Sequence, residues 1–546
     1  MAAPTNPERS EDPAPLPLGT VPRRTEGAAV LVATGILLSR VIGLVRNRVL
    51  AYYFGTSAAS DAYNAALRIP NFLQNLFGEG ALSASFIPVY ARLLADEDEA
   101  EAGRVAGAVF AALALLTATL VLLGVLFAPL LTDLIAPGFA GARRDLTVRL
   151  VRIMFPGVGL LVLSAWCLGV LNSHRRFLLS YAAPVVWSLA IIAALVFWGD
   201  ARDLPRLAEV AAWGSVAGAA LQFGVQLPVV LRLVPRLRVG LSRASPHVRT
   251  VVRNFLPAAV SRGVVQVSAF IDQMIASFLP AGSVALLSYA SMLYTLPVSL
   301  FGMAVSAAEL PAMSSVGGDA VVAAAALRTR LDAALRRVAF FIVPSAVAFV
   351  ALGDVIARLV LENGRFTEAD ARWVWAILAG SAVGLLASTL GRLYSSVYYA
   401  RRDTRTPLRF ALVRVALTIG LGYLFALPLP RALGIDARWG TAGLTASAGV
   451  AGWVEFVLLR RSLNRQIGTT GLARDYLARL WLSGAAAAGA GLALKGSAPI
   501  AALPTLPRCA LILGGFALVY GIATSILGVP LARQIVRRVA RRLGRC

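Results

Sequence analysis

The chain has 546 residues, is 58% hydrophobic and carries a formal net charge of +24, and its mean hydropathy is +0.73. This composition leaves too little polar surface to cover a globule in water, which excludes the ordinary soluble classes. Apolar runs of about 20 residues, the length that crosses a bilayer's hydrocarbon core, recur along the chain. Runs this long predict helices rather than barrel strands. We therefore expect an all-α integral membrane protein.

Charged residues and Gly/Pro breaks separate these runs into about fourteen predicted transmembrane helices. In chain order they are 27–49, 65–93, 105–133, 146–172, 179–198, 208–233, 250–279, 284–312, 335–360, 372–400, 407–429, 437–460, 476–496 and 507–529.

The basic residues are almost all arginine, and they gather in a few segments between the predicted helices. These segments are 175–176, 232–253, 328–337, 401–409, 460–479 and 533–545. All of them fall on the same side of the membrane as the N-terminus, and positively charged segments stay in the cytoplasm. We therefore expect both termini to be cytoplasmic. Membrane topology accounts for the positive charge, so no nucleic-acid partner is expected.

The sequence also repeats itself at an offset of about 222 to 226 residues. The matching pairs are Leu76-Phe77-Gly78 and Leu300-Phe301-Gly302, Ser39-Arg40 and Ser261-Arg262, Gly138-Phe139 and Gly364-Arg365-Phe366, and Arg175-Arg176 and Arg401-Arg402. The two members of each pair are offset by six helices, so the two halves have the same orientation in the membrane. Parallel repeats of this kind place a substrate path between two lobes.

The repeat ends near residue 470, and two predicted helices follow it. The expected organisation is a disordered cytoplasmic tail (1–26), an N-lobe of six helices (27–245), a C-lobe of six helices (246–470), two lipid-groove helices (471–530) and a basic cytoplasmic tail (531–546).

Ionisable residues inside membrane helices cost about 2.5 to 3.5 kcal/mol each on insertion scales, so they usually face a cavity. Arg40 and Arg262 lie mid-helix at matching places in the two repeats. A pseudo-two-fold axis would bring both guanidinium groups to one central space, where an anion such as phosphate suits their planar donor forks. Arg414 and Glu455 are more readily interpreted as a structural ion pair.

Glycine and proline residues interrupt the second and eighth predicted helices. They are Gly78, Gly80 and Pro88 in the second and Pro297, Gly302 and Pro311 in the eighth. They fit two interpretations equally: close packing of helices, or bending as the lobes rock between two states.

Sequence signatures of catalysis are missing from this chain. The three cysteines have no metal or redox spacing, both histidines lie in basic segments, and there is no nucleotide-binding motif. We therefore expect no enzyme activity, no metal and no cofactor. Coupling to the membrane potential or to a monovalent ion is the expected source of energy.

Several motifs resemble the MurJ (MviN) family of flippases, in a likeness that covers residue 27 to the end. They are the runs 39–46, 54–55, 60–62, 70–71 and 78–88 in the first two helices, followed by 136–139, 171–173, 176–177, 364–367 and 399–407. The run 78–88 (Gly-Glu-Gly-Ala-Leu-Ser-Ala-Ser-Phe-Ile-Pro) and the run Arg402-Asp403-Thr404-Arg405-Thr406-Pro407 are the most specific.

The resemblance implies the MOP exporter fold, with two six-helix lobes around a cationic cavity and two extra helices beside a lipid-tail groove. It also implies export of lipid II, the undecaprenyl-diphosphate-linked peptidoglycan precursor, across the bacterial inner membrane by alternating access, for cell-wall synthesis. The implied partners are this glycan lipid, membrane lipids and other cell-wall synthesis proteins. Substrate-binding residues expected on this basis are Arg40, Arg46, Asp61, Arg68, Asn71, Glu79, Arg262 and Gln266.

The chain departs from the family pattern in two places. Gln74-Asn75 stand where a basic pair is often found, and Met292 stands where the eighth helix often carries an arginine. We expect Arg262, on the seventh helix, to restore the missing charge of the C-lobe.

Two other classes remain open from the sequence. One is a different MOP exporter, either a polysaccharide-repeat lipid flippase or a drug/cation antiporter, although such proteins usually lack the two trailing helices. The other is a membrane-embedded transferase acting on the same lipid, which would need a clustered acidic or histidine site.

Overall fold

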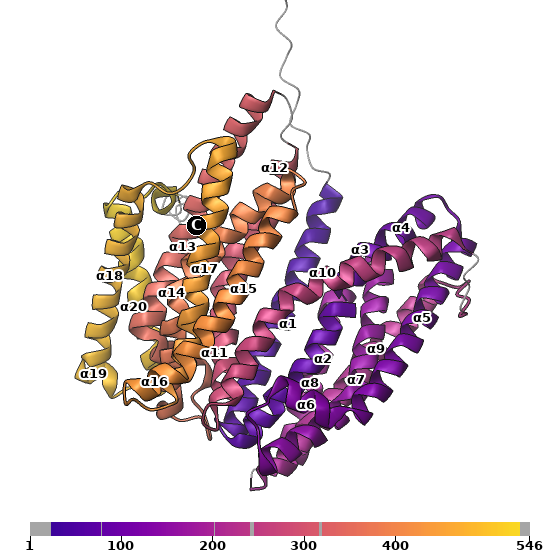
Figure 1. Ribbon diagram of the computed structural model, residues 1–546, viewed down its shortest axis with the longest axis horizontal. Helices are drawn as coiled ribbons and strands as arrows, with labels where there is room; N and C mark the ends of the chain where they lie inside the picture. The colour runs from indigo at the N-terminus through magenta and orange to yellow at the C-terminus, as the bar shows by residue number, and fades with distance from the viewer. Residues whose placement is uncertain (1–22, 78, 201, 241–244, 316–318, 535–546) are drawn as a thin grey trace, which may run out of the picture.

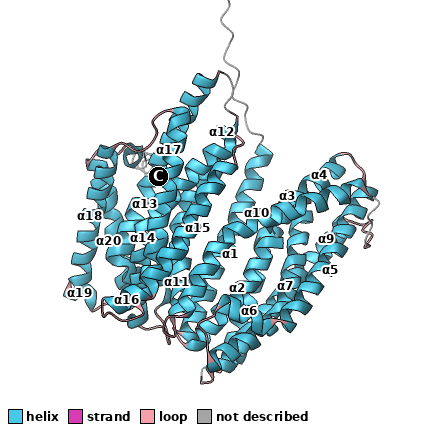
Figure 2. Cartoon of the chain, in the orientation of Figure 1, coloured by secondary structure: helices cyan, strands magenta, loops and turns pink. Residues whose placement is uncertain are grey.

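The computed structural model describes residues 23–534 except 78, 201, 241–244 and 316–318. Within these residues the regular structure is helical and contains no strand (Figure 2), which confirms the all-α expectation. The helices are α1 (Arg23–Phe54), α2 (Ala58–Phe77), α3 (Glu79–Ser85), α4 (Ile87–Ala95), α5 (Glu99–Leu126), α6 (Ala128–Ile135), α7 (Gly141–Ser173), α8 (Phe177–Trp198), α9 (Leu204–Leu233), α10 (Pro246–Ser277), α11 (Ser283–Pro297), the π-helix η1 (Val298–Met303), α12 (Ala304–Ser314), α13 (Ala320–Leu361), α14 (Glu368–Ala400), α15 (Arg405–Ala426), α16 (Pro428–Ala432), α17 (Trp439–Ile467), α18 (Arg474–Gly496), α19 (Ala498–Ala501) and α20 (Thr505–Ile526).

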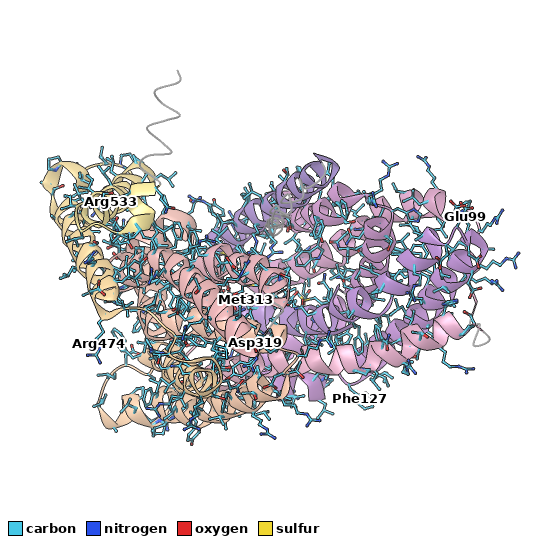
Figure 3. All side chains as sticks on the ribbon, turned by 90° about the horizontal axis from the view of Figure 1, so that it is seen from above. Glu99, Phe127, Met313, Asp319, Arg474 and Arg533 are labelled. Atoms are coloured by element: carbon cyan, nitrogen blue, oxygen red, sulfur yellow. The ribbon has the colours of Figure 1, made fainter. Side chains whose placement is uncertain are left out.

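The helices form two bundles, with α2 to α9 on one side and α11 to α20 on the other (Figure 1). Each bundle has an apolar core of its own: Trp166 and Phe86 are fully buried in the first, and Tyr394 and Tyr398 in the second. Seen from above, Glu99 and Arg533 mark the far ends of the two bundles (Figure 3). The bundles follow the two halves of the repeat, so a path between them has the position that the repeat predicts.

Helix α10 crosses obliquely between the bundles (Figure 1). Near its start, Val248 and Val251 belong to the core of the first bundle. Near its end, Ile275 lies beside Gly422 of α15. The expected lobe boundary at residues 245 and 246 assigns all of α10 to the C-lobe, whereas its first turns pack against the other bundle.

The two trailing helices, α18 and α20, pack directly on α13. Tyr476 and Tyr520 donate hydrogen bonds to the carbonyl oxygens of Arg336 (3.0 Å) and Phe340 (2.8 Å). Residues of both helices belong to the apolar core of the second bundle. The trailing pair therefore extends this bundle, although it lies outside the sequence repeat.

Eleven of the described helices are long and apolar enough to cross a membrane. The first, second and seventh predicted spans correspond to α1, to α2–α4 and to α10, which are not among the eleven. These are the helices that carry Arg46, Arg68 and Asp272. The side chains of 23–33 and 36 in α1 and of 258 and 260–269 in α10 lie outside the described residues, so neither helix is judged over its whole length. The number fourteen itself stays a prediction.

The expected interruptions coincide with breaks in helical geometry. The second predicted span is divided into α2, α3 and α4, with Gly80 in α3 and Pro88 in the first turn of α4. In the eighth, Pro297 ends α11, Gly302 lies in η1 and Pro311 lies in α12. Single π-helical turns inside longer helices are frequent at functional sites. Gly78 lies outside the described residues, and a bending role for these positions stays a prediction.

Glycine permits a very close crossing of α14 and α17 next to the space between the bundles. A Cβ atom added to Gly384 would lie 2.3 Å from the Cα atom of Gly449, which is far inside van der Waals contact. Small residues let membrane helices approach in this way, and dispersion contacts then hold the pair together. This crossing fixes how α14 and α17 present their side chains to the centre of the protein.

We predict that Gly384→Ala destabilises the folded protein by about 1 to 3 kcal/mol, because the added methyl group overpacks this crossing. Gly420→Ala on α15 is the matched control, since nothing lies within 4 Å of its Cβ position. Thermal unfolding in detergent measures both variants. A melting temperature for Gly384→Ala at or above that of Gly420→Ala would contradict the expectation.

Candidate functional site

A polar pocket of about 340 Å³ lies between the two bundles. Side chains from α1, α2, α10, α11, α14, α15 and α17 line it. The charged residues among them are Arg46, Arg68, Asp272 and Arg414. Both halves of the repeat therefore contribute charged groups to a single cavity.

Arg46 and Arg68 enter the pocket from the first bundle, and each lies over an aromatic ring. The guanidinium carbon of Arg46 is 4.7 Å from the ring centre of Trp187 on α8. That of Arg68 is 5.8 Å from the ring centre of Phe270 on α10. A cation–π contact helps to hold a guanidinium group in place. Nε of Arg46 is buried and has no hydrogen-bond partner among the described residues.

Among the described residues one carboxylate, Asp272, lines the pocket, and a second, Glu455, is paired with a lining arginine. Asp272 of α10 lies within electrostatic reach of Arg68 and Arg414, and its Oδ1 atom is buried with no hydrogen-bond partner in the described part of the chain. Glu455 of α17 accepts a hydrogen bond from Nη1 of Arg414 at 3.1 Å. The expected pairing of Arg414 with Glu455 is therefore confirmed.

The structure brings together only part of the substrate-binding set expected from the sequence. Arg46, Arg68 and Asn71 line the pocket. Arg40 is exposed on α1 and is not among the lining residues; it lies six positions before Arg46, about 9 Å along the helix at a 1.5 Å rise. The side chains of Glu79, Arg262 and Gln266 lie outside the described part of the structure, so their roles stay predictions.

Asp61 is not among the lining residues of the pocket. Its side chain is fully buried, and its expected role in substrate binding stays a prediction. Oδ2 accepts a hydrogen bond from the backbone N–H of Gly282 (2.7 Å), and Oδ1 accepts one from that of Ala285 (2.8 Å). Both N–H groups belong to the first turn of α11, whose partial positive charge favours a carboxylate. A residue of the first bundle thus caps a helix of the second.

Arg143, at the start of α7, supports this contact. Its Nη1 atom lies 3.4 Å from Oδ2 of Asp61, and its guanidinium group lies 4.1 Å from the ring centre of Phe139. The same loop brings the N–H of Gly138 to Oγ of Ser277 at 2.9 Å. The Gly-Phe motif at 138–139 therefore contributes to the contacts that join the two bundles, a role that sequence analysis did not assign to it.

Further hydrogen bonds join the bundles at the same end of the molecule, away from the termini (Figure 1). The N–H of Arg365 donates to the carbonyl of Tyr52 (2.9 Å), and Oγ1 of Thr56 donates to Asp370 (2.6 Å). Gly364 makes this approach possible, since its φ is +55° and an added Cβ would lie 2.6 Å from the Tyr52 oxygen. We name these contacts, together with those of Asp61, the junction.

A second cavity, of about 790 Å³, is an apolar groove beside the trailing helices. Phe301 of η1, Phe341 and Pro344 of α13, and Phe516 and Ile522 of α20 are among its lining residues. The rings of Phe301 and Phe341 stack at 4.3 Å. The lining of this groove is mostly apolar, and the lipid-tail role that the family resemblance implies for this region stays a prediction.

Two helical bundles, a charged pocket between them and an apolar groove on one side define a multi-pass membrane transporter for an amphipathic substrate. The chain belongs to the MurJ family: its residues 50–500 match the family profile described as "Lipid II flippase MurJ".

Similar curated proteins include the "Probable lipid II flippase MurJ" of Rhizobium meliloti, which is 30% identical over 94% of this chain and 95% of that protein. The "Lipid II flippase MurJ" of Burkholderia cenocepacia is 33% identical, covering 80% of this chain and 84% of its own length.

Two solved structures share the fold, which confirms the expected MOP exporter architecture. "Lipid II flippase MurJ, inward closed conformation" aligns with a TM-score of 0.75 at 24% identity, over 93% of this chain and 100% of that one. An inward-facing multidrug resistance MATE transporter of the MOP superfamily aligns with a TM-score of 0.61 at 17% identity, over 81% of this chain and 100% of that one.

We predict that Asp61→Ala loosens the junction. Each lost charge-assisted hydrogen bond is worth about 1.5 to 3 kcal/mol, so the variant opens this end at least tenfold more often. The probe is Ser283→Cys, because Ser283 is only 1% exposed. In a cysteine-free background, a water-soluble maleimide reacts faster with this cysteine when Asp61 is alanine. Asp133→Ala, which removes an exposed carboxylate paired with Arg144, is the control; equal labelling rates in the two variants would contradict the prediction.

Proposed function

We propose that this chain moves lipid II from the cytoplasmic to the outer leaflet of the bacterial inner membrane. The observation that carries the proposal is the presence of both Arg46 and Arg68 in one pocket between the bundles of a chain that belongs to the MurJ family. Guanidinium forks bind diphosphate oxygens through charge-assisted hydrogen bonds. A drug-cation antiporter would need a net acidic cavity, whereas arginine outnumbers carboxylate among the described lining residues.

The two cavities fit the two ends of such a lipid. The diphosphate and sugar bind in the polar pocket, while the polyprenyl tail stays in hydrocarbon or lies in the groove between α13 and α20. Burying the tail in this groove contributes about 25 cal/mol per Å² of apolar surface removed from water. Helix α11 with η1 touches both cavities, since Tyr294 lines the pocket and Phe301 lines the groove.

Alternating access follows from where the bundles are joined. Several hydrogen bonds of residues 47–61 join α1 and α2 to the second bundle, from Asn47 at the pocket to the end of the molecule away from the termini. The headgroup therefore enters from the side of the termini. Breaking the junction and closing the other side would then present it to the opposite leaflet.

The direction and the energy source are also part of the proposal. Arginine-rich segments place the termini in the cytoplasm. An inside-negative potential drives an anion outward with about 2.3 kcal/mol per charge per 100 mV if the charge crosses the whole field. The potential, or a monovalent ion moving with it, is the proposed driving force.

We expect Arg46→Ala and Arg68→Ala each to cut lipid II flipping in proteoliposomes at least tenfold, because each removes charge-assisted bonds worth about 1.5 to 3 kcal/mol. Both variants should also fail to complement a flippase-depleted strain. Arg152→Ala, an exposed arginine of α7, is the matched control and should flip like the wild type. Wild-type activity in both pocket variants would contradict the proposed binding site. Failure of the wild-type protein to flip lipid II would contradict the proposed function.

Cysteine labelling tests the orientation. Val239 precedes α10 and is 61% exposed, and Leu433 precedes α17 and is 62% exposed. In intact cells, an impermeant maleimide should label Leu433→Cys at once and Val239→Cys only after the inner membrane is permeabilised. The reverse pattern would invert the topology and with it the direction of transport.

A further inference from the structure

The second bundle faces the pocket without an arginine on α11. Met292, at the position where the family often has one, packs against α1, with Nδ2 of Asn47 lying 2.7 Å from its sulfur atom. A thioether is a weak acceptor and supplies no charge. A diphosphate gripped by both bundles therefore needs a cation from another helix of the second bundle.

Arg414 of α15 meets this need. It lines the pocket, its side chain is 36% exposed, and Glu455 takes up only Nη1 among the described residues. An arginine has five N–H donors in a rigid fork. Nε and Nη2 of Arg414 are therefore left for a ligand in the pocket.

The charge around Arg414 also favours an anion. Glu455 lies within electrostatic reach of a second arginine, Arg392 of α14, as well as being paired with Arg414. Among the described lining residues, three arginines and the single carboxylate of Asp272 leave a net positive charge in the pocket. In a low-dielectric site that charge attracts phosphate strongly.

Asp272 marks where the anion would lie. It comes from α10, the helix that crosses between the bundles, and it lines the same pocket as Arg68 and Arg414, within electrostatic reach of both. Its Oδ1 atom is buried without a hydrogen-bond partner in the described part of the chain. A buried carboxylate oxygen that lacks a bond is costly, so this contact is easily exchanged for a better one.

We propose that Arg414 is the phosphate-binding residue of the second bundle, and that Asp272 stands in for the phosphate between Arg68 and Arg414 while the pocket is empty. Arrival of the diphosphate displaces the carboxylate and bridges the same two arginines with an anion of higher charge. Both bundles then hold the headgroup as they rock. The inference rests on the proposed function, since it names further contacts of the same headgroup.

Binding of undecaprenyl diphosphate to the full-length protein in nanodiscs tests this assignment. Arg414→Gln should weaken the affinity about ten- to a hundredfold, as expected for the loss of charge-assisted hydrogen bonds worth about 1.5 to 3 kcal/mol. Arg414→Lys should recover part of it, because lysine keeps the charge and loses the fork. Arg409→Gln, an exposed arginine on the same helix, is the matched control and should bind like the wild type.

A double variant separates ligand binding from a structural ion pair. Replacing both partners of a buried pair by apolar residues often preserves stability. Arg414→Leu with Glu455→Leu should therefore keep the melting temperature of the wild type and still lose the affinity for the diphosphate. Wild-type affinity in this double variant, or in Arg414→Gln, would show that the pair is structural only and overturn the assignment. A wild-type protein that binds no diphosphate would overturn the proposed function as well.

Asp272→Asn tests whether Asp272 stands in for the phosphate, and here the affinity for undecaprenyl diphosphate is expected to rise. Asparagine removes the competing negative charge, so undecaprenyl diphosphate should bind about tenfold more tightly, a gain of about 1.4 kcal/mol. The gain should disappear when Arg414→Gln is combined with it. In that background the Asp272 carboxylate and the phosphate no longer compete for the guanidinium group of Arg414. Unchanged or weaker binding in Asp272→Asn would refute the stand-in role.

Discussion

The cost of placing charge in hydrocarbon organises this protein. Each ionised side chain costs about 2.5 to 3.5 kcal/mol at the middle of a membrane helix, so the helices that carry such residues must face protein or water. Helices α1, α2 and α10 carry several of them and line the pocket between the two apolar bundles, which α10 crosses obliquely (Figure 1). Aromatic rings cover the guanidinium groups of Arg46 and Arg68. The charged pocket is therefore both the costliest part of the structure and the part suited to an anionic headgroup.

The same constraint shapes the junction. Asp61 is buried completely, yet both of its oxygens accept hydrogen bonds from the backbone of α11. A helix N-terminus has N–H groups without partners of their own, so the contact satisfies both bundles. Because it is polar and local, water can replace it at a modest cost. A junction of this kind holds one state firmly and still allows another, which a larger apolar interface would not.

Motifs that sequence analysis recognised by resemblance have acquired physical roles. Gly364 adopts a left-handed backbone so that Arg365 can reach Tyr52, and Gly138 approaches Ser277 closely. Asp403 in the loop before α15 accepts hydrogen bonds from the side chain and backbone of Thr406, which hold the pKa of its carboxyl below the usual range. The pairing of Arg414 with Glu455 was also predictable, because each is costly alone in a membrane helix. Its position at the pocket wall was not.

The sequence by itself determined the membrane class, the helical fold, the two-part repeat and the family, because hydropathy and charge are local properties that add up along the chain. The family resemblance also identified Arg46 and Arg68 as cavity candidates, whereas Arg40, which the repeat indicated, is not among the described lining residues of the pocket. Only the tertiary structure decided which charges meet. The shared position of Asp272 near Arg68 and Arg414 depends on three helices, and the capping of α11 by Asp61 depends on two bundles. Such encounters are set by helix rotation and crossing, which close contacts such as that of Gly384 with Gly449 control.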